Sequence, residues 1–488
     1  MKRLLTAWRQ FPFWPRWTAL TGLGLVIAWL GYDFYGRRQW AEFVERYNVP
    51  GTTLDFEQVR EKQRAEKGTP HFLHTPSMRK WESRNPDHDP AFTDLLTKFP
   101  TGITIPIYPP GRAFGWRTGE ISSLGAFLAE AAPGTVSEAE AARILRSALA
   151  SSDGAIAELC HDATVPGRPW LQEIPNISAI NDFARLLSLR IRVAISNNDG
   201  ERALEELLCS LRFSERLRES ESLIGMLIQL YVLETLEDAI WEGIECGIWE
   251  EKELGQLALK LEKLTITRDY SKVALCEIGT VRDSIRETET IFGSWRWFCV
   301  KSLKEEFSPL KIFDLASHNW KGATWSFCEI VLPEGHRRNG FAQYGKFWES
   351  SGLCPPDAAG SFPEFSVELL DLPFYRPHPI FAIAAPHLGR VGETLLTRQQ
   401  FVDLARLACE VRRFQLQEGR FPMALTELHL DTTIPRDRFQ PTLLVRYRVN
   451  ADQTEFSLIA SGPDRTDDGG NRDTDFVFSS SATSKVSK

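Results

Sequence analysis

Apolar residues recur at helical spacing from Ser137 to about Leu264, and this pattern constrains the fold more than any other feature of the chain. Ser137 followed by Glu140 is typical of a capping box at the start of the first helix. Further helices are expected over about 180–196, 201–218, 222–245 and 250–264. Antiparallel helices joined by turns of about four residues indicate stacked helical hairpins. The spacing is not regular, so the irregular helical-repeat domain predicted for 137–264 has an ordinary helical bundle as its alternative.

The N-terminus contains 16 uncharged residues, from Trp17 to Tyr32, preceded by four Lys and Arg residues. A straight membrane span needs about 20 residues, but aromatic side chains on both sides can occupy the interfaces. No small-x-small cleavage site follows, which favours an uncleaved anchor over a signal peptide. The charge bias favours a cytoplasmic segment 1–16, a transmembrane anchor at 17–36, and a location outside the cytoplasm for the rest of the chain.

The overall charge argues against a nucleic-acid partner. The chain of 488 residues has 57 Lys and Arg against 65 Asp and Glu, for a net charge of −8. It therefore lacks the positive field that attracts a phosphate backbone. Only the N-terminal run is apolar enough to meet a membrane, which excludes a polytopic transporter.

The eight cysteines are too far apart for a zinc knuckle or a CxxC redox pair, since the closest two, Cys276 and Cys299, are 23 residues apart. An oxidising compartment would permit disulfides. Four of the cysteines lie in apolar helical patterns, where a free thiol packs as a small hydrophobe: Cys209, Cys246, Cys276 and Cys409. Disulfides and buried thiols both remain open.

Residues 37–136 are predicted to form an irregular segment, because their many prolines prevent long helices beyond a short one at about 40–47. This segment contains nitrogen and oxygen side chains that suit a metal: His71, His74, Asp87, His88 and Asp89. Their spacing matches no helical metal motif, so exposed loop residues are the favoured interpretation.

Residues 265–387 form an aromatic-rich region, in which helices are expected over about 273–290 and 344–350. Five tryptophans could form a stacking platform for sugars or peptides: Trp295, Trp297, Trp320, Trp325 and Trp348. Packing of these rings between helices is the favoured alternative.

The C-terminal region changes from helical to alternating patterns. A long helix over about 388–417 ends at Gly419 and is followed by a short helical turn at 424–428. Alternating segments at 443–449, 455–460 and 475–478 predict a three-stranded antiparallel sheet. The expected fold class is therefore mainly α, with an N-terminal transmembrane helix, a helical-repeat domain and a C-terminal α+β module.

Five aspartates and two arginines share the loop between the second and third predicted strands. The aspartates are Asp464, Asp467, Asp468, Asp473 and Asp475. Carboxylates this close repel one another unless a cation or water separates them. Hard oxygen ligands at short spacing suit Ca²⁺, so the loop is a candidate calcium site, with a solvated hairpin as the alternative.

The order of long helix, Gly-Arg-Phe-Pro, short helix, strand, strand and aspartate loop resembles the C-terminal globular half of type II secretion major pseudopilins. The resemblance covers about residues 400–478. It implies a pilin-like module over 388–478, with a disordered tail at 479–488. It also implies that Asp464 and Asp475 bind calcium, with Asp467 and Asp468 in the equivalent loop. Arg465 replaces the family's usual glycine, and the distant anchor indicates that the chain is not itself a pilin subunit.

The layout of the whole chain is similar to that of membrane-anchored bacterial envelope proteins, which implies a single-pass inner-membrane location. No GxSxG, Walker, GxGxxG or HExxH motif identifies a reaction. Cys160, His161 and Asp162 cannot form one triad, because sequence neighbours point in different directions. A hydrolase triad assembled from distant residues is one alternative.

These patterns together predict a scaffold or adaptor whose helical array binds another envelope protein. The competing prediction is binding of cell-wall glycan or peptide through the Trp-rich region.

Overall fold

The computed structural model describes residues 13–47, 116–117, 124, 137–164, 177–218, 223–279, 334–350, 353, 388–428 and 434–481. The chain divides into two compact units. Unit 1 comprises Met1–Val59, Leu275–Ser361 and Pro373–Pro386, and unit 2 comprises Arg60–Ala274, Phe362–Leu372 and His387–Lys488. Each unit is described by itself.

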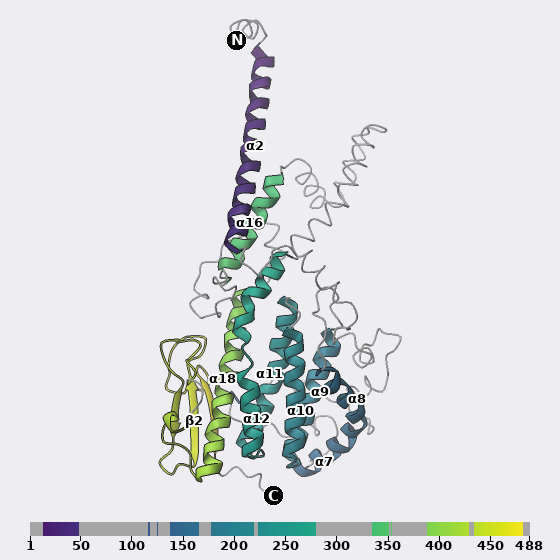
Figure 1. Cartoon of the computed structure of the whole chain (residues 1–488), viewed down its shortest axis with the longest axis vertical. Coiled ribbons are helices and arrows are strands. Elements are labelled where there is room, and N and C mark those ends of the chain that lie inside the picture. Colours follow the sequence, from purple (N-terminus) through teal and green to yellow (C-terminus); the bar gives the residue numbers. More distant parts are fainter. Residues whose placement is uncertain are drawn as a thin grey trace. The chain divides into compact units, whose positions relative to one another are not determined.

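Unit 1 contains two helices that lie side by side, α2 (Phe13–Tyr47) and α16 (Glu334–Ser350) (Figure 1). The apolar N-terminal run and the short helix expected at 40–47 are parts of one continuous helix of 35 residues. Helix α16 begins at Glu334, earlier than the expected Tyr344. Among the described residues, no helix combines the length and the apolar composition of a membrane span.

Unit 2 begins with the predicted helical array. Its elements are α7 (Glu138–Leu149), η2 (Ala150–Ser152), α8 (Asp153–Asp162), α9 (Ile177–Ser196), α10 (Gly200–Arg218), α11 (Leu223–Glu245), α12 (Glu251–Glu262) and η3 (Ile266–Asp269). Helices α9, α10 and α11 pack against one another, and α7 packs on α9. The predicted boundaries are confirmed to within a few residues. The N-cap half of the predicted capping box is confirmed, because the Ser137 hydroxyl accepts a hydrogen bond from the Glu140 N–H at 3.3 Å, whereas the Glu140 carboxylate pairs with Arg143.

The turn between α11 and α12 depends on two glycines. Gly247 adopts a φ of +62°, which ends α11 because a left-handed residue cannot continue the helix. The chain then folds back so that the Trp249 ring covers Gly243, where an added Cβ would lie 2.3 Å from the ring. Trp249 is buried, and α12 begins at the next turn with Glu250 and Glu253 as a capping box.

The C-terminal part of unit 2 contains α18 (Leu388–Glu418), η5 (Leu425–Leu428), β1 (Arg446–Val449), β2 (Glu455–Ala460) and β3 (Phe476–Ser481). The strands form an antiparallel sheet in the order β1-β2-β3, as predicted. Helix α18 packs against α11 and α12, and β3 packs against α11 (Figure 1). The helical array and the C-terminal module therefore belong to one compact unit.

The core of unit 2 consists of helix faces and the inner side of the sheet. Phe401 on α18 lies between Trp116 and Phe478, with ring centroids 4.9 Å and 6.1 Å away. Phe421, directly after the end of α18, packs edge-on against Phe456 of β2. The described structure is thus mainly helical with a small three-stranded antiparallel sheet.

Candidate functional site

The loop between β2 and β3 holds all five predicted calcium ligands, and Asp475 is the only buried one. Its carboxylate accepts hydrogen bonds from the backbone N–H of Gly470 at 2.7 Å and of Asp468 at 3.4 Å. Asp467 forms an ion pair with Arg446 of β1 and accepts from the Gly469 N–H at 2.9 Å. Backbone amides and one arginine therefore engage both of these carboxylates.

The other three aspartates, Asp464, Asp468 and Asp473, are all exposed. Asp464 accepts from the Thr466 N–H at 3.1 Å in a local turn. Within the described ranges, no three His, Cys, Asp or Glu side chains gather into a group that could hold a metal. Calcium binding by this loop stays a prediction, and it requires Asp467 to leave or share its contact with Arg446.

Other candidate residues lie largely outside the described ranges. This applies to His71, His74, Asp87, His88 and Asp89, and to Trp295, Trp297, Trp320 and Trp325. Trp348 is described and fully buried in unit 1, with its ring edge-on to Tyr344 and Phe347. Packing, the favoured alternative, therefore holds for Trp348.

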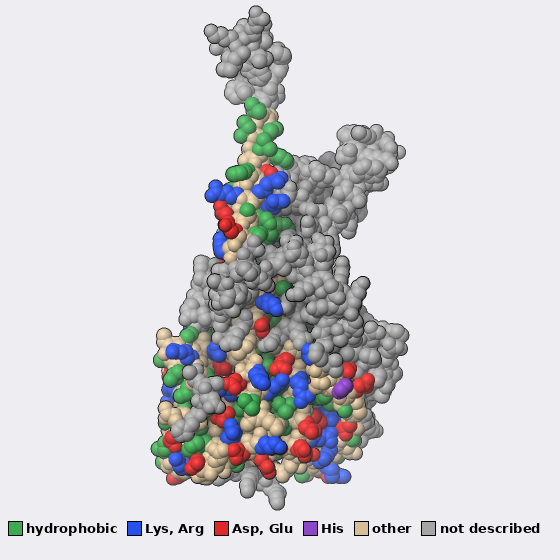
Figure 2. Space-filling view, in the orientation of Figure 1, with side chains coloured by type: hydrophobic (Ala, Val, Ile, Leu, Met, Phe, Trp, Pro, Cys, Tyr) green, Lys and Arg blue, Asp and Glu red, His purple; other side chains and the backbone are tan. Residues whose placement is uncertain are grey.

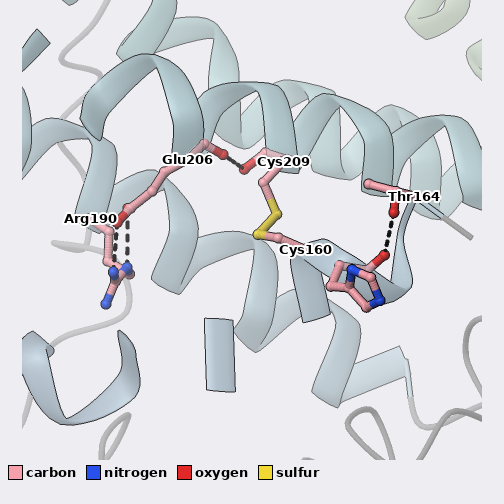
Figure 3. The surroundings of a disulfide bond; sticks show 7 residues. Cys160, Thr164, Arg190, Glu206 and Cys209 are labelled. Carbon is pink, nitrogen blue, oxygen red and sulfur yellow. Dashed lines mark hydrogen bonds and ion pairs between the residues drawn. A yellow bond between two sulfur atoms is a disulfide. The ribbon is translucent and has the colours of Figure 1, made fainter. Parts of the chain in front are cut away.

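A disulfide joins Cys160 on α8 to Cys209 on α10 (Figure 3). The two Cα atoms lie 5.3 Å apart, although 49 residues separate them in sequence. Among the described cysteines, Cys246, Cys276 and Cys409 form no disulfide, and only Cys409 of the three is buried. Among its described cysteines, the array thus contains one disulfide and one half-buried thiol, Cys246, and the Cys160 sulfur is bonded and cannot act as a thiolate nucleophile.

A charged cluster lies one turn of α10 before the disulfide (Figure 3). The Arg190 guanidinium donates to Glu206 at 2.6 Å and to Asp153 at 2.8 Å. Arg202 donates to the same two carboxylates, at 3.1 Å and 2.8 Å. Arg190 also donates to the Ser152 hydroxyl at 2.6 Å, so the cluster links α8, α9 and α10.

The recess beside this cluster has three arginines in its lining. Arg146 pairs with Asp199 at 3.0 Å, and Arg190 and Arg202 are paired as described. Because each arginine already contacts a carboxylate, the recess offers no unpaired positive charge to an anion.

A second charged cluster is buried between α11, α18 and the Trp116–Arg117 segment. Glu237 of α11 accepts a hydrogen bond from Arg398 of α18 at 2.7 Å and from the Trp116 indole at 2.9 Å. The backbone N–H of Trp116 donates to Asp238 at 3.1 Å. Oε1 of Glu237 is buried and has no hydrogen-bond partner in the part of the chain that the structure describes. These contacts make Glu237 the link between three segments that are distant in sequence.

Burial sets the electrostatics of this second cluster. It raises the pKa of the Glu237 carboxyl to about 7, against the opposing effects of Arg398 and Trp116. Burial also raises the pKa of Asp238 and lowers that of Arg117, whose guanidinium lies 4.6 Å from the centroid of the Phe476 ring. Glu237 can therefore gain or lose a proton near neutral pH.

Neither the Arg190 cluster nor the Glu237 cluster was predicted from the sequence. One signal was present in α11, where acidic residues interrupt an otherwise apolar helix at one-turn spacing: Glu234, Glu237, Asp238 and Glu242. Carboxylates on a buried helix need partners, and Glu242 finds one in Arg192 of α9 at 2.6 Å. The identity of the partners depends on which helices pack against α11.

Comparison with known proteins gives no relative: no protein-family model, curated protein or solved structure matches this chain.

Proposed function

We propose that this protein is a membrane-anchored scaffold or adaptor of the bacterial envelope, with the bulk of the chain outside the cytoplasm. The observation that carries the proposal is the Cys160–Cys209 disulfide inside the helical array. Disulfides persist in oxidising compartments such as the periplasm and are rare in the cytosol. The disulfide in the array therefore supports an oxidising compartment, outside the cytoplasm, as the location of the predicted partner-binding domain.

The exposed N-terminal half of α2 supports the anchor. Leu25, Ile27 and Leu30 are between 55% and 67% exposed, and every residue from 21 to 31 is exposed. A helix that is apolar on all sides is stable in a protein core or in lipid, not in water. We assign this part of α2 to the bilayer, within the anchor predicted for residues 17–36.

The outer faces of α7 and α8 are our candidate for the partner surface. Helix α18 and strand β3 already pack against α11, so this part of the array has an internal partner. On α7 and α8, exposed side chains include Arg143, Ser147, Ala157 and Glu158. Helical arrays bind proteins through such stacked outer faces.

In-cell photocrosslinking tests this function. A benzophenone amino acid at Ser147 or Ala157 should yield a discrete adduct with one envelope protein, whereas Asp452 in the β1–β2 turn serves as the exposed control. Protease added to spheroplasts, with the inner membrane intact, should digest unit 2. Protection of unit 2, or identical adducts at Ser147 and Asp452, would contradict the proposal.

The pilin-like module carries a separate proposal, that Ca²⁺ stabilises the β2–β3 loop. The loop geometry supports it in one respect, since Asp475 is buried and already orders Gly470 through a 2.7 Å hydrogen bond. A cation among the five aspartates would add to this ordering.

A further inference from the structure

Helices α2 and α16 of unit 1 run parallel to each other. Asn339 donates to the Tyr32 hydroxyl at 3.4 Å, and Lys346 donates to the Gln39 side chain at 2.9 Å. The order of contacts along α16 is therefore the same as along α2. Nearer to the C-terminal ends, Tyr47 donates to Glu349 at 3.3 Å, which continues the same order.

Close packing sets the register of this pair. The Phe43 ring covers Gly345 of α16, where an added Cβ would lie 2.3 Å from a ring carbon. Phe43 is buried, and Trp40 contacts Phe341 with ring centroids 5.6 Å apart. Since glycine is required at Gly345, the two helices cannot slide along each other without a clash.

A contact between α16 and α2 lies directly after the exposed apolar stretch of α2. Tyr32 accepts from Asn339 of α16, and residues 21–31, which precede it, are all exposed. The first charged residue after the apolar run, Asp33, follows at once and pairs with Arg37 at 2.7 Å. Figure 2 shows the same change along α2, from hydrophobic to charged side chains.

We propose that the first turns of α16 lie at the membrane surface, level with Tyr32, and that acyl chains surround α2 only on the N-terminal side of this level. The inference rests on the proposed anchor and adds the position of the membrane surface and a second segment in contact with it. The lipid headgroup layer would then meet the exposed rings of Phe34 and Tyr35 and the first turns of α16.

Two physical limits hold the surface at this level. If the bilayer reached farther along α2, it would cover Asp33 and Arg37, and burying such charges in lipid is costly. If it ended earlier, Leu30 would remain in water at 55% exposure. The uncharged run spans about 24 Å at 1.5 Å per residue, which is less than the thickness of the hydrocarbon core, about 30 Å. The whole uncharged run is therefore needed to cross the core.

A structural consequence is that the chain returns to the membrane surface in the first turns of α16. Because α16 is parallel to α2, both helices lead away from the bilayer from the same level. Unit 1 would therefore contact the surface at two places that about 300 residues of sequence separate.

Lipid photocrosslinking of the full chain tests the inference. The benzophenone amino acid is placed at Leu25, Leu30 or Ala41 on α2, and at Arg338 or Lys346 on α16. The protein is reconstituted in vesicles of phosphatidylethanolamine and phosphatidylglycerol. We expect lipid adducts from Leu25, Leu30 and Arg338, and none from Ala41 and Lys346.

The outcomes separate this inference from the anchor. Adducts at Leu25 and Leu30 without one at Arg338, or with one at Lys346, would overturn the surface level while the anchor stands. No lipid adduct at any position, with the chain released from vesicles by carbonate, would overturn both. In a Gly345→Leu variant, the adduct at Arg338 should fall several-fold while that at Leu25 remains. Gly154→Leu on α8 is the matched control, since an added Cβ there meets nothing within 4 Å.

Discussion

Arg398 on α18 donates a hydrogen bond to Glu237 on α11 across 2.7 Å, and both side chains are buried. The same guanidinium contacts Glu234, whose side chain is 51% exposed, at 2.7 Å. One arginine thus joins the C-terminal helix to the helical array through one buried and one exposed carboxylate. Breaking one side of a buried pair is costly because it leaves a charge without compensation.

Stability should depend on pH through Glu237. Burial raises the pKa of this carboxyl from 4.5 to about 7, so the unfolded chain releases the proton first as pH rises. The stabilisation is complete below about pH 4.5 and is lost as pH rises through about 7. The Glu237→Gln variant should lack this loss. Its stability relative to the parent should therefore increase between pH 5 and pH 8, by up to about 3 kcal/mol.

Denaturant unfolding at several pH values measures this effect. Glu234→Gln is the control, because it changes the exposed carboxylate that pairs with the same arginine and should leave the slope with pH unchanged. If the difference in unfolding free energy between Glu237→Gln and the parent is constant from pH 5 to pH 8, the raised pKa of Glu237 is contradicted.

Removing the disulfide should destabilise unit 2. We expect the Cys160→Ser and Cys209→Ser variants to lose about 2–4 kcal/mol of unfolding free energy. A reductant should lower the melting temperature of the parent to that of the variants and should leave the variants unchanged. Cys246→Ser, at a free thiol, should keep the parent's response to reductant. Equal melting of the parent with and without reductant would exclude a stabilising role for the bridge.

Calcium should raise the melting temperature of the full chain if the β2–β3 loop binds it. The Asp464→Ala and Asp475→Ala variants should both abolish the shift. Asp475→Ala should in addition melt earlier without calcium, because the Gly470 N–H loses its 2.7 Å acceptor. Asp452→Ala, in the β1–β2 turn, should leave the calcium response intact. If titration of Ca²⁺ into the parent releases or absorbs no heat, the proposed calcium site is contradicted.

Asp437 should be essential for the sheet's attachment to its preceding loop. Its buried carboxylate accepts from the backbone N–H groups of Phe439 at 2.8 Å, Gln440 at 3.0 Å and Ser461 at 2.6 Å. Asp437→Ala leaves these donors unsatisfied, and we expect a loss of about 2–5 kcal/mol in chemical unfolding. Asp437→Asn keeps one acceptor and should lose less. A loss of under about 1 kcal/mol in Asp437→Ala would show that water replaces the carboxylate.

Local sequence patterns were sufficient for most of the described elements of unit 2, whereas α16 of unit 1 begins ten residues before its expected start. The apolar spacing in α9 to α12 and the alternation in β2 predicted each element to within a few residues, because these signals come from neighbours along the chain. Gly419, at a φ of +73°, marks the end of α18 for the same local reason. The five aspartates of the β2–β3 loop were likewise visible as a cluster.

Only the tertiary structure decided which distant residues meet. Sequence could not pair Cys160 with Cys209, nor align α16 with α2 through Asn339 and Tyr32. It could not bring Arg398 to Glu237 across 161 residues either. The reason is physical: a helix pattern shows which face is apolar, whereas the partner of a buried charge or thiol depends on how helices pack. The sequence by itself determined the helices, the strands and the exposed apolar run, and packing determined the contacts that join them.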